Sequence, residues 1–360
     1  LMWLRDYHFD GLRLDAVHAI FDASAIHILE ELKIKVEKLS AQLGRNLFLI
    51  AESDLNNPRL LWSRERGGYQ LDAQWSDDFH HALHSVLTGE RNGYYEDFGS
   101  LADLAKALRY AFVYDGKFSA HRKRIHGRPI GDLNGARFLG YLQNHDQIGN
   151  RAQGGRSSHL ISRGKLKIGA AIVLTSPFVP MLFQGEEWGA STPFQFFTDH
   201  RESELAKAVG IGRCKEFEMF GWKPEEIPDP QDRETFLRSK LKWQEISKSQ
   251  HREILDWHKK LIQLRRREKD LTGGDLNLVE INFSEEDFWL TIRRNEIVVA
   301  CNLKDKSQSV PIGRRGSVAE IHGGAAAPPC QILLASELKI KVEQGTVHLP
   351  AESVAIIRRK

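Results

Sequence analysis

Three apolar runs that each end at an acidic side chain constrain this chain most. They are Gly-Leu-Arg-Leu-Asp at 11–15, Leu-Phe-Leu-Ile-Ala-Glu at 47–52 and Leu-Gln-Asn-His-Asp at 142–146. Apolar runs of this kind are typical of strands buried on both faces, and parallel strands carry their carboxyl ends to one rim of the sheet. The pattern therefore predicts that Asp15, Glu52 and Asp146 stand at such a rim.

These acids allow two interpretations. Two carboxylates across a cleft, one ionised and one protonated, are the minimum equipment for cleaving a glycosidic bond. Each acid could equally cap a strand end or pair with a nearby arginine. Three acids in the same context favour catalysis, because acids with shifted pKa values gather at functional sites.

Strand-like and helix-like segments alternate through the first part of the chain. Apolar residues at helical spacing run from Ile26 to Leu39, and Gly44 ends that helix. Further strands are expected at 71–75, 138–143 and 179–184, and helices near 77–89, 100–112 and 163–175. The basic stretch at 121–126 could be a phosphate-binding strip, but a solvated loop between two helices explains it equally well. This alternation predicts a parallel sheet.

The pattern changes after a polar segment that contains Pro224, Pro228 and Pro230. An amphipathic helix is expected at 249–267, and Gly273-Gly274 marks a break. Beyond the break, short alternating runs continue to the end and predict antiparallel strands. We therefore expect two domains, at 1–272 and 273–360.

Charge and cysteine content narrow the class of partner. With 51 basic and 48 acidic side chains the formal charge is +3, which gives no reason to expect nucleic acid or an anionic membrane surface as a partner and favours a neutral ligand. Cys214, Cys301 and Cys330 are too few and too far apart for a disulfide framework or a metal motif, so a cytoplasmic location is expected. No run approaches the roughly 18 apolar residues of a membrane span.

The three acidic runs resemble three of the four signature regions of the α-amylase superfamily of glycoside hydrolases, in the same order. The matching segments are Gly11 to His18, Ile50 to Ser53 and Gln143 to Asp146. Finer features resemble the trehalohydrolase family within that superfamily: they lie at 51–56, 72–81, 94–99, 183–188 and 227–232. The likeness covers nearly the whole chain and is weaker in the last domain.

The resemblance implies a fold as well as a departure from it. The expected fold is a partial (β/α)8 TIM barrel, about strands 4–8, followed by a C-terminal antiparallel β-sandwich. The first signature region, Asp-x-x-x-Asn-His, is missing together with the strands before it. We therefore expect this chain to be the C-terminal portion of a longer protein, active when whole and inactive as this piece alone.

Roles follow from the resemblance residue by residue. It makes Asp15 the nucleophile, Glu52 the general acid and base, and Asp146 a ligand of sugar hydroxyls. Arg13 would keep the nucleophile ionised, and His145 would bond the same sugar.

The trehalohydrolase resemblance also implies a substrate. This is malto-oligosyltrehalose, a short α-1,4-glucan that ends in trehalose, and hydrolysis of the adjacent α-1,4 bond releases trehalose. Candidates for recognising the trehalose end are Trp75, Asp77, Asp78, His80, His81, Tyr94, Tyr95 and Asp97. No cofactor is implied, and we expect no metal site because His80 and His84 have no evident third ligand.

Two alternatives use the same residues. A glycogen branching enzyme or an α-amylase would share Asp15, Glu52 and Asp146, so only the loops distinguish these specificities. A non-catalytic glucan-binding module is a different class, and the presence of all three acids argues against it.

Overall fold

Five parallel strands form the sheet of the first part of the molecule, in a computed structural model that describes residues 1–218, 222–313 and 330–359. In spatial order they are β1 (Gly11–Leu14), β2 (Phe48–Ala51), β3 (Ala73–Trp75), β6 (Phe138–Gly140) and β7 (Val179–Pro180). Each neighbouring pair is parallel. The predicted parallel sheet is confirmed.

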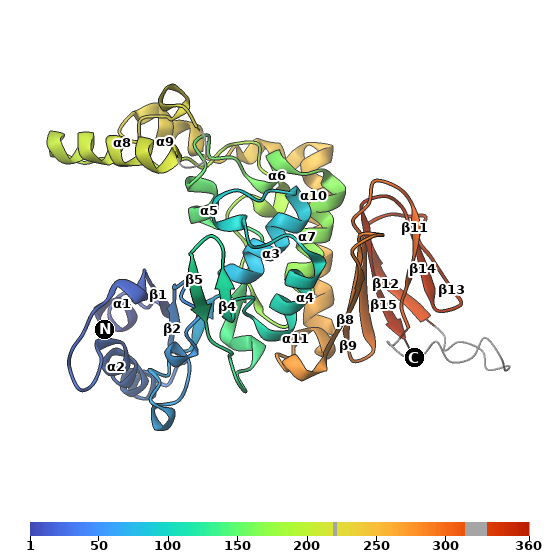
Figure 1. The fold of residues 1–360 in the computed structure, drawn as a ribbon, viewed down its shortest axis with the longest axis horizontal. Helices are drawn as coiled ribbons and strands as arrows, with labels where there is room; N and C mark the ends of the chain where they lie inside the picture. The colour runs from blue at the N-terminus through green and yellow to red at the C-terminus, as the bar shows by residue number, and fades with distance from the viewer. Residues whose placement is uncertain (219–221, 314–329, 360) are drawn as a thin grey trace.

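Helices connect these strands and pack on one face of the sheet (Figure 1). The long ones are α2 (Ile28–Leu43), α3 (Asp77–Thr88), α4 (Leu101–Tyr110), α7 (Arg163–Thr175) and α10 (Ser249–Arg267). Short helices are α1 (Met2–Arg5), α5 (His145–Gly149), α6 (Ser157–Leu160), α9 (Arg233–Ser239) and α11 (Lys269–Thr272). Leu49 and Phe138 join the helix-side core, whereas Trp75 and Leu139 form a small cluster with Tyr141 and Ile50. Alternation along each strand therefore divides the side chains between two faces.

Several elements are shorter than the sequence predicts. The first strand ends at Leu14 because Ala16 takes a positive φ of 41° and the chain turns into a 3-10 helix at Val17–Ala19. The first long helix starts at Ile28 rather than Ile26, since the Asp22 carboxylate accepts the backbone N–H of Ile28 at 2.6 Å. The strands expected at 138–143 and 179–184 stop early, and the bond from Met181 N to Gly140 O is 2.9 Å.

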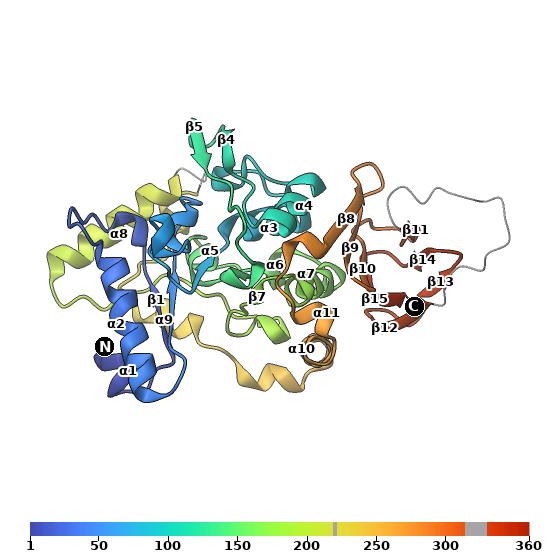
Figure 2. The same ribbon diagram turned by 90° about the horizontal axis from the view of Figure 1, so that it is seen from below.

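Two elements were not predicted. The basic stretch expected as a loop belongs to an antiparallel hairpin of β4 (Asp115–Ser119) and β5 (Arg124–Gly127), which stands out from the body in Figure 2. Its strands are too short and too polar for alternation to reveal them. A helix, α8 (Ser203–Glu218), occupies part of the polar segment.

The last part of the chain forms two antiparallel sheets. The first has the order β12 (Cys330–Ala335), β15 (Ser353–Arg359), β10 (Ile297–Asn302), β9 (Trp289–Arg294) and β8 (Val279–Ser284). The second has the order β11 (Gln308–Pro311), β14 (Thr346–Leu349) and β13 (Lys341–Glu343). Val298 and Val347 belong to the cluster between the sheets, which supports the antiparallel pattern predicted after Gly274.

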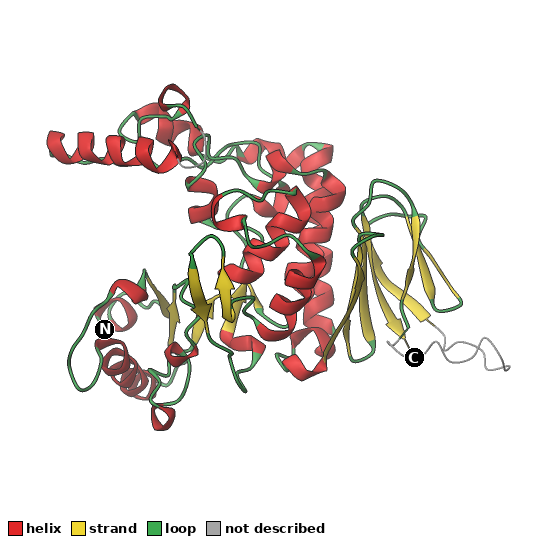
Figure 3. Ribbon diagram, in the orientation of Figure 1, coloured by secondary structure: helices red, strands yellow, loops and turns green. Residues whose placement is uncertain are grey.

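Helices α3, α4, α7 and α10 lie between the parallel sheet and the antiparallel strands, as Figure 3 shows in the orientation of Figure 1. Ile292 and Ile356 share one continuous core with residues of α7. The buried Arg294 of β9 donates to the carbonyl oxygens of Thr175 and Ser176 at 3.0 and 2.9 Å, at the end of that helix. These bonds join the two parts. None of the helices in the described ranges is both long and apolar enough to cross a membrane.

Candidate active site

The carboxyl ends of β1 and β2 hold Asp15 and Glu52 side by side. Leu14 lies opposite Ala51 in the parallel ladder, so the next residue of each strand is an acid. Glu52 N donates to Leu14 O at 3.0 Å, and Val17 N donates to Glu52 O at 3.1 Å. These bonds continue the ladder past both acids, and they confirm that the first two acidic runs lie on adjacent strands.

The guanidinium group of Arg13 brings all three predicted acids together. Arg13 Nη1 donates to Asp15, while Arg13 Nη2 lies 3.6 Å from Glu52 Oε2 and 3.8 Å from Asp146 Oδ2. Arg13 is on the same strand face as Asp15, as its spacing predicts. One cation therefore offsets part of the repulsion among three carboxylates.

These contacts also bound the distances between the acids. The Glu52 and Asp146 oxygens share one neighbour, Nη2, so they are no farther apart than the sum of the two distances. Asp15 contacts the other terminal nitrogen of the same planar group. All separations stay below the roughly 9.5 Å upper limit for paired-carboxylate hydrolysis. The geometry thus permits the two acids to act on one sugar.

The surroundings of the two leading acids differ. The Glu52 side chain is 17% exposed and accepts the N–H of Ala16 at 2.6 Å, whereas the Asp15 side chain is 79% exposed. Ala16 lies in the left-handed region that side chains other than glycine rarely adopt, a feature often found at functional sites. This turn carries the chain from Asp15 back toward Glu52, so its conformation positions the Ala16 N–H.

Asp146 and His145 open the short helix α5. Asn144 caps this helix by accepting the Asp146 N–H at 2.7 Å, and His145 Nε2 lies 3.3 Å from Asp146 Oδ1. The Trp75 ring lies against Arg13 and His145. The Arg13 guanidinium is 4.4 Å from a Trp75 ring centroid, and the centroid of the His145 ring is 6.0 Å away, edge to face. Trp75 therefore forms a wall of the same cluster.

Asp77 begins α3 two residues after β3 and is half-buried beside the site. The Tyr141 hydroxyl donates to its carboxylate. Burial raises the pKa of Asp77 to about 7, the hydrogen bond from Tyr141 opposes that shift, and the negative charge of Glu52 adds to it. Sequence reasoning missed Tyr141, although its alternation with Leu139 places it on the Trp75 face.

Asp78 and Asp97 are engaged in internal hydrogen bonds. Asp78 is buried and accepts the N–H groups of Val113 and Tyr114 at 2.7 and 2.8 Å and the Asn56 amide at 2.7 Å. Burial raises the pKa of Asp78 to about 6 despite these bonds. Burial would also raise the pKa of Asp97, but hydrogen bonds from Ser119 and Tyr114 outweigh it and lower that pKa. Both carboxylates hold the loops around α3.

The remaining candidates form an aromatic cluster on α3 and the loop after it. His80 Nδ1 lies 2.7 Å from Leu142 O, and its Nε2 lies 2.9 Å from the Tyr95 hydroxyl. The His81 ring stacks on Tyr94 with centroids 5.0 Å apart. Burial lowers the pKa of His81 to about 3, so this imidazole is neutral at physiological pH. Their predicted role at the trehalose end of the substrate stays a prediction.

No set of three or more His, Cys, Asp or Glu side chains with metal-binding geometry occurs within residues 1–218, 222–313 and 330–359.

Curated relatives match almost the entire chain, although no family model matches it. A malto-oligosyltrehalose trehalohydrolase of Arthrobacter ramosus is 54% identical over 357 residues, 99% of this chain and 58% of the relative. Those of Rhizobium sp. (strain M-11) and Mycobacterium tuberculosis (strain ATCC 25618 / H37Rv) are 48% and 45% identical, over 99% of this chain and 58% and 59% of the relatives. The chain thus spans somewhat under two thirds of these relatives' length.

Solved structures agree with this relationship. A putative α-amylase from Salmonella typhimurium superposes with a TM-score of 0.82 at 32% identity, over 99% of this chain and 58% of that chain. An α-amylase from H. orenii, at 16% identity and a TM-score of 0.53 over 99% of this chain and 62% of that one, shares the fold. Over almost its whole length the chain is therefore similar to malto-oligosyltrehalose trehalohydrolases and to a solved putative α-amylase.

Proposed function

We propose that this chain carries the catalytic acids of a retaining glycosidase that cleaves the α-1,4 bond next to the terminal trehalose of malto-oligosyltrehalose. The observation that carries the proposal is the contact of one guanidinium group, that of Arg13, with Asp15, Glu52 and Asp146. The family relationship supports the substrate.

The proposed reaction has two steps. Asp15 attacks the anomeric carbon of the glucan unit while Glu52 gives a proton to the departing O4 of trehalose, so trehalose leaves and a covalent glycosyl-enzyme forms. Glu52 then takes a proton from water, whose oxygen displaces Asp15 from the same carbon. Two inversions give net retention. Asp146 and His145 bond the hydroxyls of that sugar, and the loop residues around α3 recognise trehalose.

We propose that the five parallel strands are strands 4–8 of a (β/α)8 barrel that further segments of the full-length protein complete. Strand β1 has one described neighbour, and the exposed apolar residues Trp3, Phe9 and Phe21 lie close to it in sequence. An open edge of this kind invites pairing with further strands. The proposed domains are 1–272 and 273–360, and the proposed location is the cytoplasm, on the basis of cysteine usage.

The decisive experiment compares two substrates with the full-length protein. Maltotriosyl-trehalose should yield trehalose and one new reducing end, detected by a reducing-sugar assay, whereas maltopentaose should be hydrolysed little. Rapid hydrolysis of maltopentaose would support an α-amylase instead, and new α-1,6 branches would support a branching enzyme. NMR of the first-formed reducing end should show the α anomer, because the mechanism retains configuration.

Isosteric variants test the acids themselves. Glu52→Gln and Asp15→Asn should each lower kcat by roughly a thousandfold or more while leaving substrate binding measurable. Glu65→Gln, on an exposed turn, is the matched control and should keep wild-type turnover. Residues 1–360 alone should hydrolyse the substrate far more slowly than the full-length protein, because Asp15 is largely exposed at an open sheet edge. Turnover at the wild-type rate in Asp15→Asn would show that Asp15 is not the nucleophile.

A further inference from the structure

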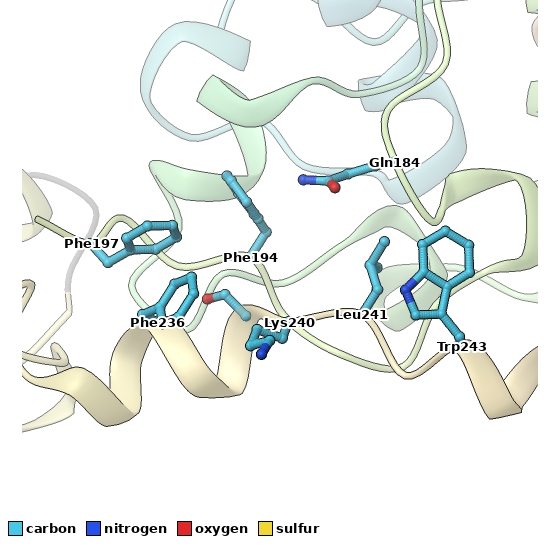
Figure 4. A pocket seen from close by; sticks show the side chains of 8 residues that line it. Gln184, Phe194, Phe197, Phe236, Lys240, Leu241 and Trp243 are labelled. Carbon is cyan, nitrogen blue, oxygen red and sulfur yellow. The ribbon is translucent and has the colours of Figure 1, made fainter.

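An aromatic groove lies beyond the end of β7, in the segment between Gln184 and Trp243. It consists of two cavities of about 390 and 570 Å³ that share Phe197 and Phe236 as lining residues. These volumes fall in the range of small-molecule sites, roughly 300–1,000 Å³. Figure 4 shows Phe197 and Phe236 at one end of the first cavity, Trp243 at the other, and Gln184 on the opposite wall from α9.

The rings of the groove form a connected series. Phe194 and Phe197 have centroids 6.1 Å apart, and Phe197 meets Phe236 edge to face at 5.1 Å. At the other end Trp243 packs on the buried Trp188 at 5.2 Å. Trp243 is nevertheless 63% exposed and Phe236 is 42% exposed. Large aromatic faces are thus held in place by neighbours and left open to solvent.

The walls of the groove are held by buried hydrogen bonds. The fully buried Arg156 donates Nη1 to Gln184 O at 2.7 Å and Nε to Thr192 O at 2.6 Å. The buried Ser239 hydroxyl accepts the N–H of Gln195 at 2.9 Å. Gly185, at φ 85°, lets Leu241 approach so closely that an added Cβ would lie 2.7 Å from Leu241 Cδ2. The cavity is therefore a built feature of the fold.

Polar groups at the rim are available to a ligand. Within the described ranges, neither the Gln184 amide nor the Lys240 ammonium makes a side-chain hydrogen bond, and the ammonium lies 5.8 Å from the Phe236 ring centroid. The second cavity adds Asp199, Asp232 and Arg233 to the lining. An amide and an ammonium group can bond hydroxyl groups, and flat aromatic faces can pack on the C–H faces of pyranose rings. Charges of both signs line the groove, so its chemistry fits a neutral oligosaccharide, whose hydroxyl groups both donate and accept hydrogen bonds.

The groove lies beyond the carboxyl ends of the parallel strands, as the three acids do. Gln184 follows β7 just as Asp146 follows β6, its parallel neighbour. The segment between Gln184 and Trp243 also contacts α5, because Arg213 of α8 donates to Gly149 O at 2.7 Å. The Gln195 N–H in turn bonds Ser239, which lines the first cavity, so the segment that forms the groove adjoins the helix that carries Asp146.

We propose that the groove lined by Phe197, Phe236 and Trp243 binds the α-1,4-glucan portion of the substrate, outside the unit that is cleaved. This inference rests on the proposed function for the identity of the glucan. If the groove binds the far end of the glucan, long substrates gain contacts that short substrates lack. A longer glucan should therefore lower KM and leave kcat unchanged.

The test uses the full-length protein with maltoheptaose as probe. Binding is measured by calorimetry in a Glu52→Gln background, for Phe236→Ala, Trp243→Ala and the double variant. Each lost ring should weaken binding by roughly threefold to tenfold. KM for a long malto-oligosyltrehalose should rise in the same proportion, with kcat and the KM for maltosyl-trehalose unchanged. Trp243→Phe keeps a ring and should restore most of the affinity, which excludes misfolding as the cause.

Tyr110→Ala, which removes a half-exposed ring on α4, is the matched control and should change nothing. Unchanged maltoheptaose binding in the double variant would overturn the groove proposal. If the protein still released trehalose, the proposed function would stand. Conversely, ring-dependent maltoheptaose binding without trehalose release would keep the groove and remove the function. If another part of the full-length protein covers the groove, acrylamide will not quench Trp243 and maltoheptaose will not protect it, which would also overturn the proposal.

Discussion

Replacing Asp77 with asparagine should make the full-length protein more stable at neutral pH. The wild-type carboxyl keeps its proton in the folded state up to a pKa of about 7, because desolvation disfavours the ionised form and the charge of Glu52 adds to this effect, while the hydrogen bond from Tyr141 opposes it. In the unfolded chain the same group loses its proton near pH 4. Between these values the folded state binds more protons, so stability declines as pH rises. Asparagine keeps an oxygen for the Tyr141 hydroxyl and carries no titrating proton.

The size of the effect follows from the same pKa. A difference of about three pKa units corresponds to about 4 kcal/mol of stability lost between pH 4 and pH 7. Urea unfolding of both proteins, followed by tryptophan fluorescence, should therefore show the advantage of Asp77→Asn growing by about 1.4 kcal/mol per pH unit in this window. Other buried acids titrate in both proteins and cancel in the difference.

Tyr141→Phe provides an independent control. It removes the donor that favours the ionised carboxylate, so the loss of stability with rising pH should extend above pH 7. A pH-independent difference between wild type and Asp77→Asn would refute the assignment of a half-buried, protonated Asp77.

Three further changes test the site and its support. Arg13→Met should lower kcat/KM by roughly a hundredfold, because three carboxylates lose their shared cation, whereas Arg13→Lys should retain part of the rate; steady-state kinetics of Arg13→Met at the wild-type level would contradict this role. Asp78→Ala leaves the buried N–H groups of Val113 and Tyr114 without an acceptor, removes one of two bonds of the Asn56 amide and should cost about 3 kcal/mol in urea unfolding, so an unchanged midpoint would count against the network. Phe178→Ala opens a cavity between Phe79 and Phe138 and should cost about 3–5 kcal/mol in the same assay, with a loss below 1 kcal/mol as the contrary result.

The parallel sheet could be predicted because its signal is local. Runs such as Leu47 to Ala51 are apolar on both faces, and residues at helical spacing stand between the first run and this one. The β4–β5 hairpin escaped prediction because its two strands expose Phe118 and Ile125 and place basic residues between them. Exposed apolar residues flanked by lysine and arginine carry no alternation that distinguishes a hairpin from a loop.

Sequence patterns also fail to show the surroundings of single side chains, as the two candidate acids at the start of α3 illustrate. A sequence shows that Asp77 and Asp78 are adjacent acids at a helix start, but their surroundings come from distant segments. Asp78 receives donors from Asn56, Val113 and Tyr114, which lie 22, 35 and 36 positions away, and Asp77 receives its donor from Tyr141. Burial and partner determine the proton affinity of a carboxyl group, so neither could be assigned from spacing alone.

The order of residues along the chain by itself determined that strands would alternate with helices and end at acidic side chains, because periodicity and strand length are local properties. Only the tertiary structure decided that Arg13 would reach Asp15, Glu52 and Asp146 at once, that Trp75 would wall their cluster, and that a groove would open between β7 and α9. Apart from the contact between Arg13 and Asp15, these contacts join segments more than thirty residues apart, and their distances depend on how the strands and helices pack against one another.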